Sequence, residues 1–152
     1  MSDQPPVLVI AVGNPSRGDD ALGPELAARL EAASLPGVEV ISEFQLQVEN
    51  ALDLVGRGRV VFVDAGTGTP APFDLHRAGP AAEFLHTSHA ISPEAVLATY
   101  EKINGSPAPE SWVLCVRGES FELGEALTPA AAGNLEAAWL RLREICTREP
   151  SP

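Results

Sequence analysis

The sequence lacks a segment that would cross a bilayer, since no apolar run among its 152 residues approaches the roughly 18 that a membrane helix needs. We also expect no signal peptide, because the N-terminal residues are polar and the first apolar run has no basic flank. Only two cysteines occur, Cys115 and Cys146, and their wide separation argues against a disulfide framework. We therefore expect a soluble, cytoplasmic protein, with Cys115 in a core strand and Cys146 at a helix end.

Positive charge is scarce as well. Lysine and arginine together number 10 against 21 acidic residues, which leaves a net charge of −11. The electrostatic surface that binds nucleic acid is therefore missing. The excess of carboxylates favours solubility and attracts cations or a basic partner, but it does not indicate a fold.

Signatures of an activated nucleophile are also absent. The sequence contains neither Gly-x-Ser-x-Gly nor His-Glu-x-x-His, and neither cysteine adjoins a histidine in a site-like loop. The sequence therefore argues against the familiar serine and cysteine hydrolases. A hydrolase without such a nucleophile would depend on a metal ion or on a carboxylate that acts as general base, and the sequence does not separate the two.

What the sequence does contain is a set of short apolar runs rich in β-branched residues. Three of them, Val7–Val12, Val60–Val63 and Ser111–Val116, are typical of strands buried on both faces of a parallel sheet. Two shorter strand candidates are Val38–Ile41 and Phe73–His76. Together these runs predict a sheet of about five strands.

Helical patterns lie between the strands. Apolar residues share one face of Pro24–Ala33 and of Pro129–Ile145. Ser92 is the expected N-cap of a helix that ends at Asn104, and Gln47–Val55 is a shorter helix candidate.

Alternating strands and helices indicate βαβ units. The predicted fold is a single α/β domain over residues 1–152, with a mostly parallel, twisted sheet of about five strands flanked by helices on both faces. Residues 1–6 and 147–152 are expected to be loose tails.

The first loop, from Gly13 to Gly18, follows a buried strand and precedes a helix, where α/β proteins bind ligands. Its two glycines have the spacing of a phosphate-binding loop, but Asp19 and Asp20 follow in place of Lys and Ser or Thr. Two carboxylates would repel a polyphosphate, so the loop predicts a site for a cation or a proton and not for a nucleotide. Alternatively, these carboxylates answer the dipole of the next helix, a role we assign to Asp19.

A second carboxylate, Asp64, ends another buried strand, and it would lie at the same sheet edge as Asp20. A strand-end aspartate can also simply cap a turn. His86 and His89 lie in a loop before the helix that Ser92 caps. We prefer His89 as the third member of the site because it is closer to the helix, and two carboxylates with one imidazole suit nickel or zinc.

The remaining histidine, His76, falls within a predicted strand and is expected to have no special role.

These motifs, in this order, resemble those of the hydrogenase maturation endopeptidases. The matching segments are Gly13–Gly23, which contains the acidic pair, Val63–Ala65, Thr87–Ala90, Gly118–Phe121 and Leu127–Pro129. Within that family, Gln45–Asn50 resembles the branch that serves cytoplasmic, cofactor-reducing hydrogenases. Two departures are Ala21, where glycine is frequent, and Asp20, where some members have glutamate.

The resemblance implies a five-stranded sheet and an aspartic-type, metal-dependent endopeptidase. It implies that Asp20, Asp64 and His89 are both the catalytic residues and the metal ligands. The metal would be nickel, carried by the substrate, with zinc or cadmium as possible surrogates. The substrate would be the nickel-loaded precursor of a nickel-iron hydrogenase large subunit, cut once near its C-terminus.

Two other functions remain open from the sequence. A non-cleaving chaperone that binds nickel and the precursor would use the same three ligands. A nucleotide-binding Rossmann-like domain is disfavoured by the carboxylates that follow Gly18. No membrane partner is expected.

Overall fold

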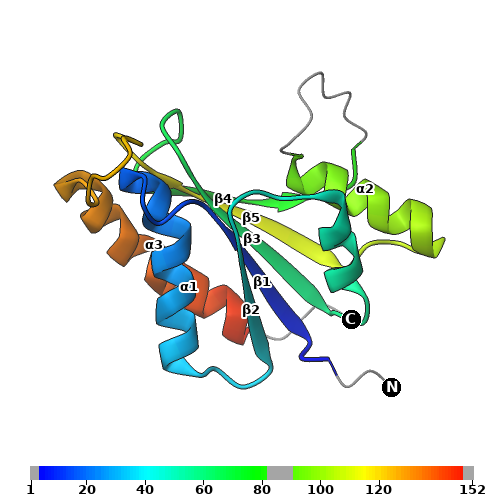
Figure 1. Ribbon diagram of the computed structural model, residues 1–152. Helices are drawn as coiled ribbons and strands as arrows, with labels where there is room; N and C mark the ends of the chain where they lie inside the picture. Colours follow the sequence, from blue (N-terminus) through cyan, green and yellow to red (C-terminus); the bar gives the residue numbers. More distant parts are fainter. Residues whose placement is uncertain (1–3, 82–90, 149–152) are drawn as a thin grey trace.

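The computed structural model describes residues 4–81 and 91–148, and its centre is one five-stranded sheet (Figure 1). The strands lie in the order β2-β1-β3-β5-β4. β1 is parallel to β2 and β3, β3 is parallel to β5, and only the edge strand β4 is antiparallel to its neighbour. The mostly parallel sheet is thus confirmed. The strands are β1 (Val7–Val12), β2 (Val38–Glu43), β3 (Arg59–Gly66), β4 (Phe73–Ala78) and β5 (Glu110–Arg117).

Helices cover both faces of the sheet, as predicted (Figure 1). Helices α1 and α3 pack on one face, whereas α2 and the 3-10 helix η2 pack on the other. None of the helices in the described part of the chain is long and apolar enough to cross a membrane. The bounds are η1 (Gly18–Ala21), α1 (Leu22–Ala33), η2 (Val48–Leu54), α2 (Pro93–Asn104) and α3 (Pro129–Thr147).

Strand β1 shows how the sequence builds the two layers. Val7, Val9 and Ala11 point to the α1 and α3 side, and Leu8 and Ile10 point to the α2 side. All five are at most 4% exposed. Each such large side chain stabilises the fold by about 1.5–3 kcal/mol. An uninterrupted apolar run is therefore what a strand between two helical layers requires.

The helix ends follow the expected caps. Ser92 Oγ accepts a hydrogen bond from the Ala95 amide at 3.1 Å, and Gly105 ends α2 with a φ of +65°. A residue with a side chain rarely adopts that conformation, so glycine is favoured at this helix end.

The prediction of loose tails is wrong for Pro5, Pro6 and Thr147, which hydrogen bonds or a helix hold in place. Arg57 Nη1 donates to the Pro5 carbonyl at 2.9 Å, and the Gly58 amide donates to the Pro6 carbonyl at 2.7 Å. At the other end α3 continues to Thr147, and Arg59 Nη1 donates to the Ile145 carbonyl at 2.8 Å. Residues 1–3 and 149–152 lie outside the described part.

The strand order creates a place for a ligand. From β1, the chain crosses to β2 through α1 on one face, and it reaches β3 through η2 on the other. The strands on either side of β1 are therefore reached by connections on opposite faces of the sheet, which makes the carboxyl end of β1 a topological switch point. Open α/β sheets bind ligands at such a switch point.

Candidate functional site

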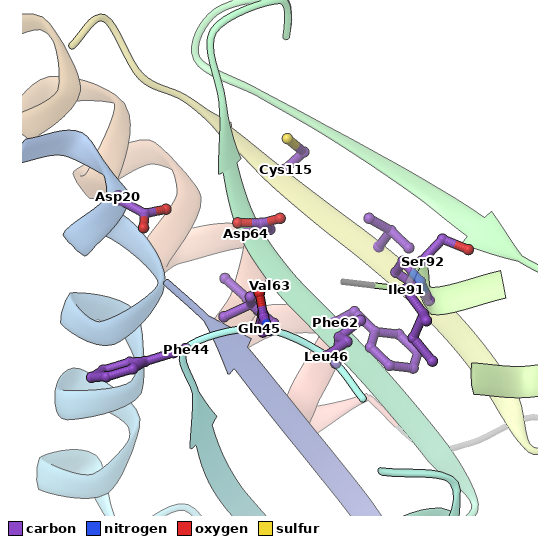
Figure 2. Close-up of a pocket in the computed structure, with 13 residues that line it drawn as sticks. Asp20, Phe44, Gln45, Leu46, Phe62, Val63, Asp64, Ile91, Ser92 and Cys115 are labelled. Atoms are coloured by element: carbon purple, nitrogen blue, oxygen red, sulfur yellow. The ribbon is translucent and has the colours of Figure 1, made fainter. Parts of the chain in front are cut away.

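The loop after β1 places Asp20 at this switch point. Gly13 has a φ of +150°, and a Cβ atom there would lie 2.1 Å from the Asp20 carbonyl oxygen. Only glycine allows the strand end to approach η1 so closely. The Asn14 amide then donates to Asp20 Oδ2 at 2.8 Å. Asp20 is half-buried, and its carboxylate faces the end of β3 (Figure 2).

Asp64 lies near the end of β3, with Oδ1 accepting a hydrogen bond from the Ala65 amide at 2.7 Å. Burial raises the pKa of the Asp64 carboxyl from its usual 3.8 to about 6. The Ala65 hydrogen bond opposes this shift, and the negative charge of Asp20 adds to it. The two carboxylates that the sequence singled out are therefore close enough to interact electrostatically.

Both carboxylates line one cavity of about 350 Å³ on the α2 side of the sheet (Figure 2). Its other walls are largely apolar, so the carboxylates provide most of its charge. Side chains from β1, β3, β5, the β2–η2 loop and the start of α2 line it: Val12, Asp20, Phe44, Gln45, Leu46, Phe62, Val63, Asp64, Ile91, Ser92, Pro93, Val113 and Cys115. With Asp20 from η1, the cavity thus draws on six separate segments of the chain.

The described residues supply only part of the predicted metal site. Among residues 4–81 and 91–148, no group of three or more histidine, cysteine, aspartate and glutamate side chains could hold a metal. His89, the predicted third ligand, lies outside the described residues, and so does His86. His76 is described: its Nδ1 lies 2.7 Å from Asp74 Oδ2 on the edge strand β4, away from the cavity.

Cys115 was expected in the core, but it forms part of the cavity wall (Figure 2). It pairs with Asp64 in the register of β3 and β5, and its Sγ lies 2.9 Å from Thr69 Oγ1. Burial raises the pKa of the thiol, and the Asp64 charge adds to that shift. Cys115 is the functional-site residue that sequence reasoning missed, although its position near a strand end gave a signal.

Cys146 lies near the end of α3, as expected. It is 4% exposed, and burial raises its pKa to about 12.

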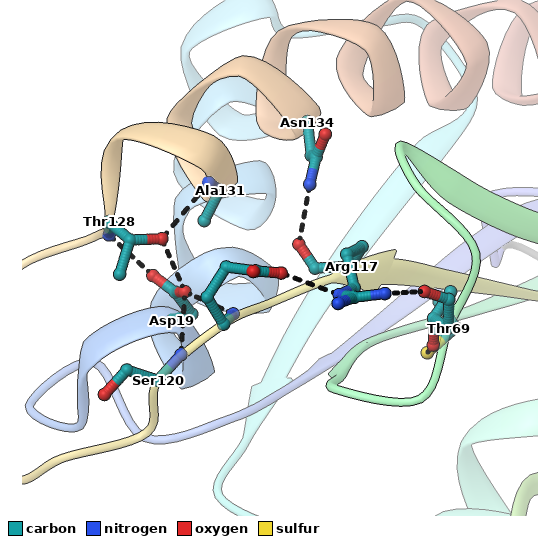
Figure 3. Close-up of polar contacts among 9 residues, drawn as sticks. Asp19, Thr69, Arg117, Ser120, Thr128, Ala131 and Asn134 are labelled. Atoms are coloured by element: carbon teal, nitrogen blue, oxygen red, sulfur yellow. Dashed lines mark hydrogen bonds and ion pairs between the residues drawn. The ribbon is translucent and has the colours of Figure 1, made fainter.

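Asp19 does not cap the helix that follows it, which corrects the role assigned from the sequence. Neither η1 nor α1 has a side-chain hydrogen bond at its N-cap. The Asp19 side chain is instead 0% exposed, and it accepts four hydrogen bonds from the segment between β5 and α3 (Figure 3). The donors are the amides of Glu119 (2.7 Å), Ser120 (3.2 Å) and Thr128 (2.7 Å) and the Thr128 hydroxyl (2.8 Å).

These bonds keep the Asp19 carboxylate charged. Burial alone would raise its pKa, but the hydrogen bonds from Glu119, Thr128 and Ser120 outweigh burial and hold the pKa below the usual 3.8. A hydrogen bond to a charged group typically contributes about 1.5–3 kcal/mol to stability. Asp19 therefore joins two segments about a hundred residues apart in sequence.

The fold is shared with several solved structures. The hydrogenase maturating endopeptidase HybD from E. coli has a TM-score of 0.69 and 22% identity, over 91% of this chain and 90% of that one. The [NiFe] hydrogenase maturation protease HycI from Thermococcus kodakarensis has a TM-score of 0.70 and 21% identity, over 97% and 96%. HybD from the same archaeon has a TM-score of 0.61 and 20% identity, over 91% and 97%.

No protein-family model matches the chain, and no curated protein matches it by sequence. The structural likeness, which extends over nearly the whole of each chain, agrees with the resemblance found in the sequence motifs and confirms the predicted fold.

Proposed function

We propose that the protein is an endopeptidase that removes the C-terminal extension of a nickel-iron hydrogenase large-subunit precursor after nickel insertion. One observation carries the proposal. Asp20, in the 3-10 helix η1 that follows β1, and Asp64, near the end of the neighbouring parallel strand β3, line one cavity of about 350 Å³. The fold that holds them is also the fold of proteins named as hydrogenase maturation proteases.

The two carboxylates suit a cation that arrives from outside. Each is an acceptor-only group when ionised, and the charge of Asp20 adds to the effect of burial in raising the pKa of Asp64. A divalent cation near both would reduce their mutual repulsion. We propose that Asp20, Asp64 and His89 contact nickel carried by the precursor, and that zinc or cadmium can replace it in vitro. Such a metal, when bound, supplies a Lewis acid that polarises a carbonyl group.

Asp64 is also suited to move a proton. With a pKa of about 6, it is mostly ionised at neutral pH, yet it is basic enough to accept a proton from an attacking water. The Ala65 amide donates to Oδ1, which leaves Oδ2 as the atom that would take the proton. The Asp64 carboxylate can thus serve as general base, with Asp20, held by the Asn14 amide, beside it in the cavity.

The rest of the cavity suits a peptide. Its apolar walls, which include Phe44, Leu46 and Ile91, can bury side chains that flank the scissile bond. Burial of this kind excludes water and strengthens electrostatic interactions at the reacting atoms. We place the reaction in the cytoplasm, since the free cysteines Cys115 and Cys146 suit a reducing compartment.

The experiment is a cleavage assay with purified precursor in nickel-loaded and nickel-free forms, read by intact mass. We expect release of a single C-terminal peptide from the loaded form only. Tight binding of the loaded precursor without release of a peptide would instead support the non-cleaving chaperone. Equal cleavage of both forms would contradict the role of substrate-borne nickel.

A further inference from the structure

The contacts of Asp19 reach beyond its own side chain. The Asp19 amide donates to the Ser120 carbonyl at 2.8 Å, the Gly18 amide to the Glu125 carbonyl at 3.1 Å, and the Gly124 amide to the Ser16 carbonyl at 2.7 Å. With the four bonds to the Asp19 carboxylate, these contacts join residues 16–19 to residues 119–128. We call this set of contacts the Asp19 interlock.

At two glycines, the two segments of the interlock lie too close together to leave room for a side chain. A Cβ atom at Gly18 would lie 2.5 Å from the Ser120 carbonyl oxygen, and one at Gly118 would lie 2.9 Å from Asp19 Cβ. Real Cβ atoms do not approach other atoms so closely, so both glycines are needed for the two segments to meet. Residues 16–19 therefore have little freedom to shift against residues 118–128.

Asp20 is the next residue in the same 3-10 turn, and it depends on that turn for its position. Its carboxylate has one hydrogen bond among the described residues, the 2.8 Å bond from the Asn14 amide. A single hydrogen bond to Oδ2 does not by itself fix both torsion angles of the side chain. The placement of Asp20 opposite Asp64 thus rests on the backbone of η1, which the neighbouring Asp19 anchors.

We infer that Asp19 is a positioning residue, which acts through the interlock to hold the Asp20 carboxylate in the cavity opposite Asp64. Thr128 is the second member of this device. Its hydroxyl donates to Asp19 Oδ2 and accepts from the Ala131 amide at 3.2 Å, so it couples Asp19 to the first turn of α3. Asp19 itself does not line the cavity and touches no reacting atom.

Two variants disturb the interlock in different degrees. Asp19→Asn replaces an oxygen that accepts hydrogen bonds with an NH2 group, which would face the amide and hydroxyl donors that now bind the carboxylate. Thr128→Val keeps the shape and removes one donor and the helix cap. Thr128→Ser keeps the hydroxyl and should restore both contacts. Should Asp19→Asn fail to fold, Thr128→Val decides the question.

The first measurement is independent of catalysis. The amide proton of Asn14 reports its hydrogen bond to Asp20 Oδ2, and its NMR chemical shift can be followed in each folded variant. We expect Asp19→Asn and Thr128→Val to move this resonance toward the position that it has in Asp20→Ala, and Thr128→Ser to leave it as in the wild type. This part of the inference stands whether or not the protein is a protease.

The second measurement rests on the proposed function. Asp19→Asn and Thr128→Val should lower kcat for precursor cleavage at least about tenfold with KM changed less than about threefold, because a misplaced group affects chemistry more than binding. Leu142→Ala and Ile145→Val are the controls, because both residues are 0% exposed and lie toward the end of α3 that is remote from the cavity. One control should lower Tm more than Asp19→Asn does, and the other should lower it less. Thr128→Ser should restore kcat.

Asp19→Asn is compared with these controls at a similar loss in Tm. If its Asn14 amide resonance and its kcat are the same as theirs, Asp19 is only structural and the inference is wrong. If the wild type cleaves no precursor, the proposed function fails, and the Asn14 resonance still decides the positioning role.

Discussion

Replacing Asp64 by asparagine should make the protein more stable at neutral pH. The folded protein raises the pKa of Asp64 from 3.8 to about 6, so ionising this group costs more in the folded state than in the unfolded state. Below about pH 4, Asp64 is protonated in the folded protein and does not lower the free energy of unfolding. As the pH rises through 6, Asp64 ionises in the folded protein, and the free energy of unfolding falls. A difference of about two pKa units corresponds to about 3 kcal/mol at pH 7.

Asparagine removes this cost and keeps the local geometry. Its Oδ1 can still accept the hydrogen bond from the Ala65 amide, and its volume is nearly that of aspartate. We therefore expect Asp64→Asn to raise the free energy of unfolding by up to about 3 kcal/mol at pH 7, which corresponds to roughly 5–10 °C in Tm for a domain of this size. Below about pH 4, the variant and the wild type should be equally stable.

The assay is urea unfolding of both proteins at intervals between pH 4 and pH 8. The stability difference should grow with pH and level off above about pH 6. Glu31→Gln, which removes an exposed charge from α1, is the control for a change in net charge and should show no such step. A difference that is flat with pH, or a variant less stable than the wild type at pH 7, would refute the reasoning.

Three further predictions concern the same site. Asp20→Asn and His89→Ala should each lower the rate of precursor cleavage at least about a hundredfold, as measured by mass spectrometry, with little loss in Tm on thermal unfolding. Normal cleavage by His89→Ala would show that this residue does not belong to the site. The free protein should bind zinc or nickel weakly, and the affinity should fall as the pH drops below about 6, because protonated Asp64 is no longer a ligand. Calorimetry at several pH values tests this prediction, and pH-independent binding would contradict it. Gly13→Ala should destabilise the protein by at least about 1–3 kcal/mol in urea unfolding, because its Cβ would meet the Asp20 carbonyl oxygen; a smaller loss would mean that the loop can move aside.

The elements of the fold were predictable because their signals are local. Apolar runs such as Val7–Val12 define strands buried on both faces, and Ser92 marks the start of a helix. The meeting of Asp20 and Asp64 was also predictable, since the carboxyl ends of parallel strands share one edge of a sheet. Those inferences need the order of elements and no knowledge of side-chain packing.

The errors concern contacts between distant parts of the chain. Asp19 resembles a helix cap in sequence, and nothing near it reveals that Glu119 and Thr128, 100 and 109 residues later, donate to its carboxylate. Cys115 belongs to an apolar run near a strand end, and the register of β3 and β5, which the sequence does not reveal, places it beside Asp64. Similarly, Pro5 and Ile145 accept hydrogen bonds from arginine side chains that are far away in sequence.

The central claim is that Asp64 belongs to a working hydrolytic site, and one purified variant tests it most directly. Nickel-loaded precursor is incubated at pH 7 with wild type and with Asp64→Asn, and the products are weighed by mass spectrometry after the fold of each protein has been checked. We expect the wild type to release one C-terminal peptide and the more stable Asp64→Asn to release none. Cleavage by Asp64→Asn at the wild-type rate would contradict the account.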